Sequence, residues 1–226
     1  MNTVAAARYY LRLLTSRQAV LAPVLFYLAL VALDYSSPGG PPRLAEPHLQ
    51  AGAITAIALM PTTAWLTRLA ATSESPPFAE VTLVALGGSG RRQAARSAAV
   101  LAIAVALACV AMLWGRVADP APYTAVTAIA LAGMHLAEAC AGAGIGVLIA
   151  PPLRTRVGTA VVAVTGLTVV SLAVPWLPPL NPVLQAAFHH KAPGLPLLLL
   201  VIAQAAALGL ACALVGTSLA RARRPG

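Results

Sequence analysis

Long apolar runs alternate with short polar segments along the whole chain. A helix that crosses the ~30 Å hydrocarbon core of a bilayer needs about 20 mainly apolar residues. Six runs approach or exceed that length, at about 19–34, 49–67, 97–115, 122–150, 157–175 and 196–219. The pattern predicts an all-α integral membrane protein with six transmembrane helices, and a single transmembrane domain that covers residues 1–226.

The segment before the first run has a different pattern. Over residues 3–18, an apolar stripe recurs at helical spacing, formed by Val4, Ala7, Leu11 and Leu14. Arg8 and Arg12 form a second stripe on the same helix. This arrangement predicts a short amphipathic helix that lies in the membrane interface, with its arginines reaching the lipid phosphates.

Charge then orients the spans. The chain has 15 Lys and Arg against 6 Asp and Glu, and its formal net charge is +9. With the N-terminus inside, twelve basic residues fall on the cytoplasmic side, namely Arg8, Arg12, Arg17, Arg68, Arg91, Arg92, Arg96, Arg154, Arg156, Arg221, Arg223 and Arg224. Only Arg43, Arg116 and Lys191 fall outside. This bias predicts that both termini are cytoplasmic. It also predicts that the basic residues of the chain contact the lipid bilayer and not nucleic acid.

The most informative segment outside the spans is 72–96, on the cytoplasmic side. Ser75 can cap a helix that begins with Pro76 and Pro77, since proline is tolerated in the first helical turn. Gly87 and Gly88 would end this helix. Its side chains include an apolar face and one acid, namely Phe78, Val81, Ala85 and Glu80; Arg91 and Arg92 follow the stop. The sequence therefore predicts a structured cytoplasmic helix over about 75–86.

One polar pair lies inside a predicted span. His135 and Glu138 stand at i and i+3 and so share a face of the fourth helix. An ionised side chain at this depth is costly unless it finds a partner, so both should face the protein interior or a cavity. Two functions stay open: a substrate contact or proton relay in the translocation path, or a hydrogen-bonded pair that fixes helix packing or a dimer interface.

Three glycines follow on the same helix, Gly142, Gly144 and Gly146. Their missing side chains let neighbouring helices approach closely, which is the simpler interpretation. A hinge or a locally unwound binding site is the alternative.

Motifs of catalysis are missing from the sequence. It has no G-x-S-x-G, no H-E-x-x-H, no paired C-x-x-C and no Walker phosphate-binding loop. The turn at Gly87–Gly90 lacks the following Lys-Ser/Thr of such a loop. We therefore expect no catalytic residue and no metal site, and we expect that the chain itself does not hydrolyse ATP.

Taken together, the layout resembles the membrane subunit of ABC transporters of the ABC-2 type, also called type V-like. The matching features are the amphipathic helix at 3–18, the acidic-to-basic segment from Glu74 to Arg96, six spans, and the Pro-rich segment from Val174 to His190 before the last span. The resemblance covers essentially the whole chain, and it rests on architecture and weak local pattern without an invariant motif.

The resemblance implies a permease that pairs with a second permease subunit, as a homodimer or heterodimer. Two separate ATP-binding cassette subunits would supply ATP and Mg, so this chain would need no cofactor of its own. The segment at 75–92 would hold the coupling helix that docks on the ATPase, with Phe78, Glu80, Val81, Arg91 and Arg92 as contacts. Direction would be export. The Arg-rich and Ala-rich composition is typical of a GC-rich bacterial genome, and thus of a multi-pass protein of the bacterial plasma (inner) membrane.

Three alternatives remain at this stage. The cytoplasmic helix could lie on lipid and contact no partner. The chain could be another six-helix transporter, such as an ion-driven carrier or the substrate-binding membrane subunit of a vitamin importer. It could also be a membrane enzyme centred on His135 and Glu138, although such an enzyme needs more polar residues at the same depth.

Overall fold

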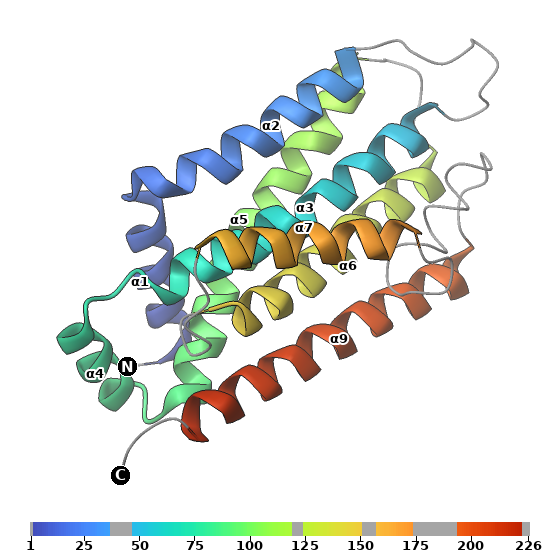
Figure 1. Ribbon diagram of the computed structural model, residues 1–226. Coiled ribbons are helices and arrows are strands. Elements are labelled where there is room, and N and C mark those ends of the chain that lie inside the picture. The colour runs from blue at the N-terminus through green and yellow to red at the C-terminus, as the bar shows by residue number, and fades with distance from the viewer. Residues whose placement is uncertain (1, 37–46, 119–123, 151–156, 174–193, 223–226) are drawn as a thin grey trace.

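The computed structural model describes residues 2–36, 47–118, 124–150, 157–173 and 194–222, and these residues form helices without any strand. The elements are α1 (Thr3–Thr15), a short 3-10 helix η1 (Gln18–Val20), α2 (Leu21–Ser36), α3 (Pro47–Ala71), α4 (Pro76–Ala85), α5 (Ser89–Ala118), α6 (Ala125–Leu148), α7 (Val157–Ala173) and α9 (Leu195–Ala222). The long helices form a bundle, and α1 and α4 lie at one of its ends (Figure 1). The prediction of an all-helical fold is confirmed.

Helices occupy all six positions where the sequence predicts spans. Within the described residues, four stretches are both long and apolar enough to cross a membrane: Gln18–Ser36, Ser89–Ala118, Ala125–Leu148 and Leu195–Gly216. The fifth predicted span contains a shorter apolar helix, Gly158–Val170. These four helices support a membrane protein, and the count of six spans stays a prediction.

Three helices, α3, α6 and α9, pack closely and run in the same direction. Gly52 of α3 approaches Leu131 of α6, and Thr67 further along α3 approaches Gly146 further along α6. Likewise, α6 meets α9 first at Gly133 and Leu198 and later at Gly144 and Gly209. The alternating topology predicted from charge requires this parallel arrangement, because α3, α6 and α9 are the second, fourth and sixth predicted spans.

The glycines of α6 sit where a side chain would collide with a neighbouring backbone. A Cβ atom on Gly142 would lie 2.3 Å from the carbonyl oxygen of Met60, and one on Gly144 would lie 2.4 Å from the Cα of Gly209. On Gly146 it would lie 2.4 Å from the Cβ of Thr67. All three glycines therefore stand at close helix contacts, two against α3 and one against α9.

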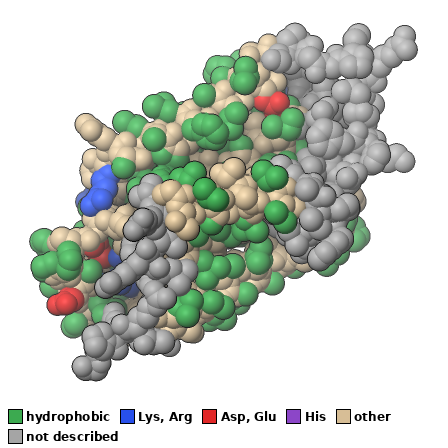
Figure 2. Space-filling view, in the orientation of Figure 1, with side chains coloured by type: hydrophobic (Ala, Val, Ile, Leu, Met, Phe, Trp, Pro, Cys, Tyr) green, Lys and Arg blue, Asp and Glu red, His purple; other side chains and the backbone are tan. Residues whose placement is uncertain are grey.

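Two further helices, α2 and α5, cover the other side of α3. Tyr27 and Val31 of α2 pack with Leu59 of α3 and with Leu107 of α5 in one buried cluster. On the face shown in Figure 2, apolar side chains cover the flank of the bundle. Charged side chains gather at the end that carries α4, apart from one acidic group at the opposite end (Figure 2).

Helix α1 packs on protein with a face that matches the predicted apolar stripe only in part, at Leu14. Its buried residues are Ala6, Tyr10 and Leu14, which join a cluster with α3 and α5. Val4, the first residue of the predicted apolar stripe, is 62 % exposed. The buried face is rotated toward Tyr10 because that side chain combines an apolar ring with a hydroxyl that finds a partner at the end of the bundle.

The helix boundaries around α4 follow local rules. Ser75 occupies the N-cap position with Pro at the first helical positions, as predicted, although its side chain makes no capping hydrogen bond. After Ala85 the chain turns at Gly87 (φ 69°) and Gly88 (φ 142°). The Gly88 N–H donates to the Leu83 carbonyl and the Gly87 N–H to the Val84 carbonyl, which is a Schellman motif.

Two predicted boundaries shift. The turn is confined to Gly87–Gly88, because α5 already begins at Ser89 and continues without a break through the predicted third span at 97–115. The fourth span, predicted over 122–150, is helical over Ala125–Leu148, with Thr124 as its N-cap. The Thr124 hydroxyl accepts a hydrogen bond from the Thr127 N–H, so a polar side chain ends the helix inside the apolar run.

We predict that Gly144→Ala destabilises the protein by about 1–3 kcal/mol, because the added methyl group would overlap the backbone of α9. Thermal unfolding of the purified chain in detergent measures this effect. Gly166→Ala on α7 is the matched control, since a Cβ at Gly166 meets nothing within 4 Å. Equal melting temperatures for the two variants would contradict the close contact of α6 with α9.

Candidate functional site

Helix α4 stands at one end of the bundle (Figure 1), and several of its apolar side chains are exposed. Phe78, Val81 and Val84 are 66 %, 65 % and 80 % exposed, and Glu80 is exposed beside them. Thr82 is the buried residue of this helix and faces the bundle. We call Phe78, Val81 and Val84 the outer face of α4. This arrangement reverses the usual amphipathic pattern, because the apolar side chains point away from the protein and a hydroxyl points inward.

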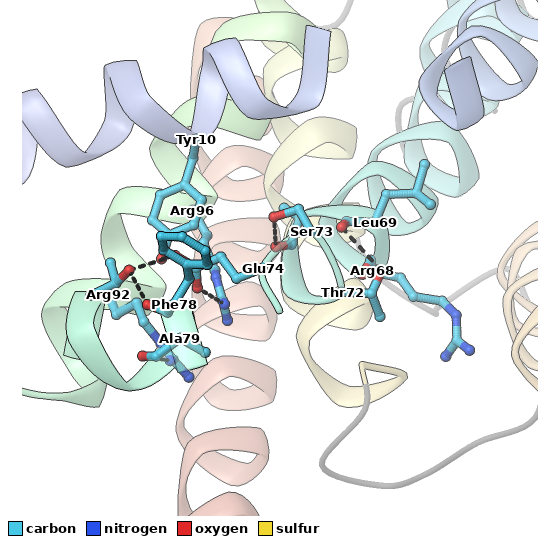
Figure 3. Close-up of polar contacts among 12 residues, drawn as sticks. Tyr10, Arg68, Leu69, Thr72, Ser73, Glu74, Phe78, Ala79, Arg92 and Arg96 are labelled. Carbon is cyan, nitrogen blue, oxygen red and sulfur yellow. Dashed lines mark hydrogen bonds and ion pairs between the residues drawn. The ribbon is translucent and has the colours of Figure 1, made fainter. Parts of the chain in front are cut away.

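A buried carboxylate holds α4 in this position. The Glu74 side chain is fully buried in the link between α3 and α4, and its Oε2 lies 2.7 Å from Arg96 Nη2 of α5 in an ion pair. Its Oε1 accepts hydrogen bonds from the Tyr10 hydroxyl of α1 at 3.0 Å and from the Thr82 hydroxyl of α4 at 2.8 Å. Figure 3 shows Tyr10 and Arg96 directed at Glu74. We call these four residues the Glu74 junction.

The two larger side chains of the junction also contact each other. The Arg96 guanidinium lies over the Tyr10 ring, 5.2 Å from its centroid, in a cation–π contact. Burial raises the pKa of the Tyr10 hydroxyl to about 12; the Glu74 carboxylate adds to this shift and the Arg96 charge opposes it. Tyr10 therefore keeps its proton at neutral pH and acts as a hydrogen-bond donor to Glu74.

Other arginines attach the neighbouring segments. Arg92 is half-buried, and its Nη1 donates to the Ala79 carbonyl of α4 at 2.7 Å. Arg17, in the bend after α1, donates to the carbonyl oxygens of Thr72 and Ser73 just before Glu74. Arg91, in contrast, is exposed. Of the two arginines predicted to contact a partner, Arg92 thus already holds α4 against α5, whereas Arg91 faces outward.

The sequence did not single out the Glu74 junction. Its members come from four separate elements, and Tyr10 and Glu74 are 64 residues apart in the chain. A weak signal was present: Glu74 is one of only six acidic residues, and it lies in a segment with many arginines. A lone acid among bases must pair with one of them if it is buried, but spacing alone does not say with which.

We predict that Glu74→Ala destabilises the α1–α4–α5 end by about 3–5 kcal/mol, because it leaves the buried Arg96 charge unpaired. Limited proteolysis at α4 and thermal unfolding measure the loss. Glu80→Ala, which removes an exposed carboxylate from the same region, should change stability by about 0.5 kcal/mol or less. Equal sensitivity of the two variants would show that Glu74 does not organise this end.

A second polar group lies inside the bundle, between α3 and α6. His135 is 1 % exposed; its Nδ1 lies 2.8 Å from the Leu131 carbonyl oxygen and its Nε2 lies 3.2 Å from the Thr55 hydroxyl. With the proton on Nδ1, the ring donates to Leu131, and its Nε2 shares the Thr55 hydroxyl proton with the Gly52 carbonyl oxygen. The imidazole therefore links α6 to α3.

Glu138 is buried in the same bundle, but its carboxyl group has fewer hydrogen-bond partners than the His135 ring has. It is 2 % exposed, and its Oε2 has no hydrogen-bond partner within the described part of the chain. Both ring nitrogens of His135 have other partners, so the two side chains do not form the hydrogen-bonded pair considered from the sequence. Both are buried within one chain, away from its surface.

Metal binding receives no support from the described residues, among which no group of three or more His, Cys, Asp and Glu could hold an ion. The Pro-rich segment from Val174 to His190 lies outside the described residues.

Comparisons of the chain with protein-family models, with curated proteins and with solved structures found no match. The proposed function must therefore rest on the residues themselves.

We predict that His135→Ala destabilises the protein by about 2–4 kcal/mol, since it removes the α3–α6 link and leaves a cavity. Glu138→Met should be neutral or stabilising, because it keeps the volume and removes an unpaired buried oxygen. Thermal unfolding of both variants in detergent distinguishes the roles. A larger loss for Glu138→Met than for His135→Ala would assign the packing role to Glu138.

Proposed function

We propose that this chain is the membrane-spanning permease subunit of an ATP-driven ABC exporter of the ABC-2 type. In this proposal it spans a bacterial plasma membrane six times, with both termini in the cytoplasm. It pairs with a second permease subunit to form a translocation path, and it is coupled through α4 to separate ATP-binding subunits that hold ATP and Mg.

The outer face of α4 is the observation that carries this proposal. Phe78, Val81 and Val84 expose apolar surface at the end of the bundle, and exposed apolar clusters of this kind mark interaction sites. The helix is attached to the bundle by Glu74 and by Arg92. A helix that is attached to the bundle by hydrogen bonds and is apolar on its exposed side can bind a partner there and transmit the partner's movement to the bundle.

The sidedness of α4 has independent support. Five arginines lie at the end of the bundle that carries α4. They are Arg8 and Arg12 in α1, Arg17 in the bend after α1, and Arg91 and Arg92 in the first turn of α5. Arg116 lies in the last turn of α5, at the other end. Because cytoplasmic loops carry an excess of basic residues, this distribution favours a cytoplasmic position for α4, where an ATPase could bind.

The energy source must lie outside this chain. Its sequence has no phosphate-binding loop, so ATP would bind and be hydrolysed in the partner subunit. Glu138 supports a second candidate, an ion-driven carrier, because an unpaired buried carboxyl oxygen within a membrane helix is a typical ion or proton site. The two candidates differ in whether a tightly bound ATPase is needed.

We predict that the full-length chain, tagged and purified from its native membrane in mild detergent, retains an ATP-hydrolysing subunit. Phe78→Ala should weaken that complex by about 2 kcal/mol, or about thirtyfold, because it removes the largest side chain of the outer face. Co-purification and ATPase activity are the measurements. Arg91→Glu should weaken it less, through an exposed charge.

Val117→Ala is the matched control for this experiment. Val117 is 81 % exposed, as much as the outer face of α4, but it lies at the opposite end of α5. The control variant should retain the ATPase at the wild-type level. A purified, transport-competent chain without any ATPase would refute the exporter and leave the ion-driven carrier.

A further inference from the structure

Helix α1 has an inner face that packs on the protein and an outer face that is exposed. Its inner face carries Tyr10, which donates to Glu74 in the junction. Its outer face carries Arg8 and Arg12, which are four residues apart and both exposed. No acidic residue lies within Thr3–Thr15 to neutralise them. We call Arg8 and Arg12 the basic face of α1.

Chain connectivity places this basic face at a membrane surface. Only Ser16 and Arg17 separate α1 from the apolar stretch Gln18–Ser36, which is long enough to cross a bilayer. Val4 and Tyr9 flank the arginines and are 62 % and 38 % exposed. Apolar and aromatic side chains beside exposed arginines suit the boundary between headgroups and acyl chains, where guanidinium groups bind phosphate.

The inner face of α1 is connected to helix α4 by two hydrogen bonds that meet at Glu74. Tyr10 and Thr82 donate to the same oxygen atom, Oε1 of Glu74. A displacement of α1 therefore acts on the carboxylate that also orients α4. Arg17 adds a second link, because it bonds the carbonyl oxygens immediately before Glu74.

We propose that the basic face of α1 binds the headgroups of anionic phospholipids, and that this binding stabilises α4 through Tyr10 and Glu74. The site would take a phosphodiester lipid with net negative charge, such as phosphatidylglycerol. That it regulates an exporter rests on the proposed function, whereas lipid binding and the link to α4 are properties of this chain alone. The membrane would then tune how firmly the partner-binding helix is held.

Hydrogen–deuterium exchange of the full chain in lipid nanodiscs tests both steps without any ATPase. Amides of α1 and α4 are compared in phosphatidylcholine and in phosphatidylcholine with about 30 % phosphatidylglycerol. Anionic lipid should slow exchange in both helices, by about fivefold for each arginine that binds. The core amides of α6 serve as an internal control for folding, since that helix is largely buried.

Variants separate the lipid site from the link. Arg8→Gln with Arg12→Gln should remove the response of both helices, and Arg8→Lys with Arg12→Lys should keep it, because a phosphate accepts either cation. Tyr10→Phe keeps the ring under Arg96 and loses only the hydroxyl. It should keep the lipid response of α1 and lose most of that of α4, to which Arg17 still provides the second link. Thr82→Val, which removes the other hydroxyl bonded to Oε1 of Glu74, should behave in the same way and provides a second variant for the link.

Three results would overturn the proposal. Exchange in α1 that is independent of anionic lipid, or unaffected by Arg8→Gln with Arg12→Gln, would remove the lipid site. A wild-type response of α4 in both Tyr10→Phe and Thr82→Val would remove the link. The same protection by inorganic phosphate in pure phosphatidylcholine would assign the basic face to a soluble anion. None of these results depends on whether an ATPase binds, so the proposed function is tested separately.

Discussion

The organisation of one end of this protein depends on the buried carboxylate of Glu74. It pairs with Arg96 and accepts hydrogen bonds from Tyr10 and Thr82, so α1, α4 and α5 meet at one side chain. Removing one partner of a buried charge is costly, because it leaves the other partners poorly satisfied. Elements that share such a group are therefore constrained to move together.

Close packing of small residues organises the rest of the bundle. Between α3, α6 and α9 the close contacts include glycines against backbone atoms, as at Gly142 and Gly144. In lipid, helix association depends on such packing and on interhelical hydrogen bonds, because burial of apolar surface contributes little there. The bond between His135 and Thr55 is one such contact. The bundle therefore combines a tightly packed core with a polar junction at one end.

Much of the fold could be predicted because its signals are local. Apolar run length located the long helices, and Ser75, Pro76 and Gly87 located α4. Two residues of the outer face of α4, Phe78 and Val81, were predicted to share a helix face from their spacing, whereas Val84 was not. The buried face of α1 was readable only in part: Leu14 of the predicted stripe is buried, whereas the inward position of Tyr10 depends on where α5 lies.

By itself, the sequence determined the positions of the helices and the glycines that permit close helix packing. It also determined that most basic residues lie at one end of the helix bundle. These properties depend on residue type and on spacing within one helix. Only the tertiary structure decided which polar groups meet: that Arg92 bonds Ala79, that His135 bonds Thr55 and not Glu138, and that Glu74 receives a hydrogen bond from Tyr10. Such pairings depend on how helices far apart in the chain are rotated and packed, which no local pattern encodes.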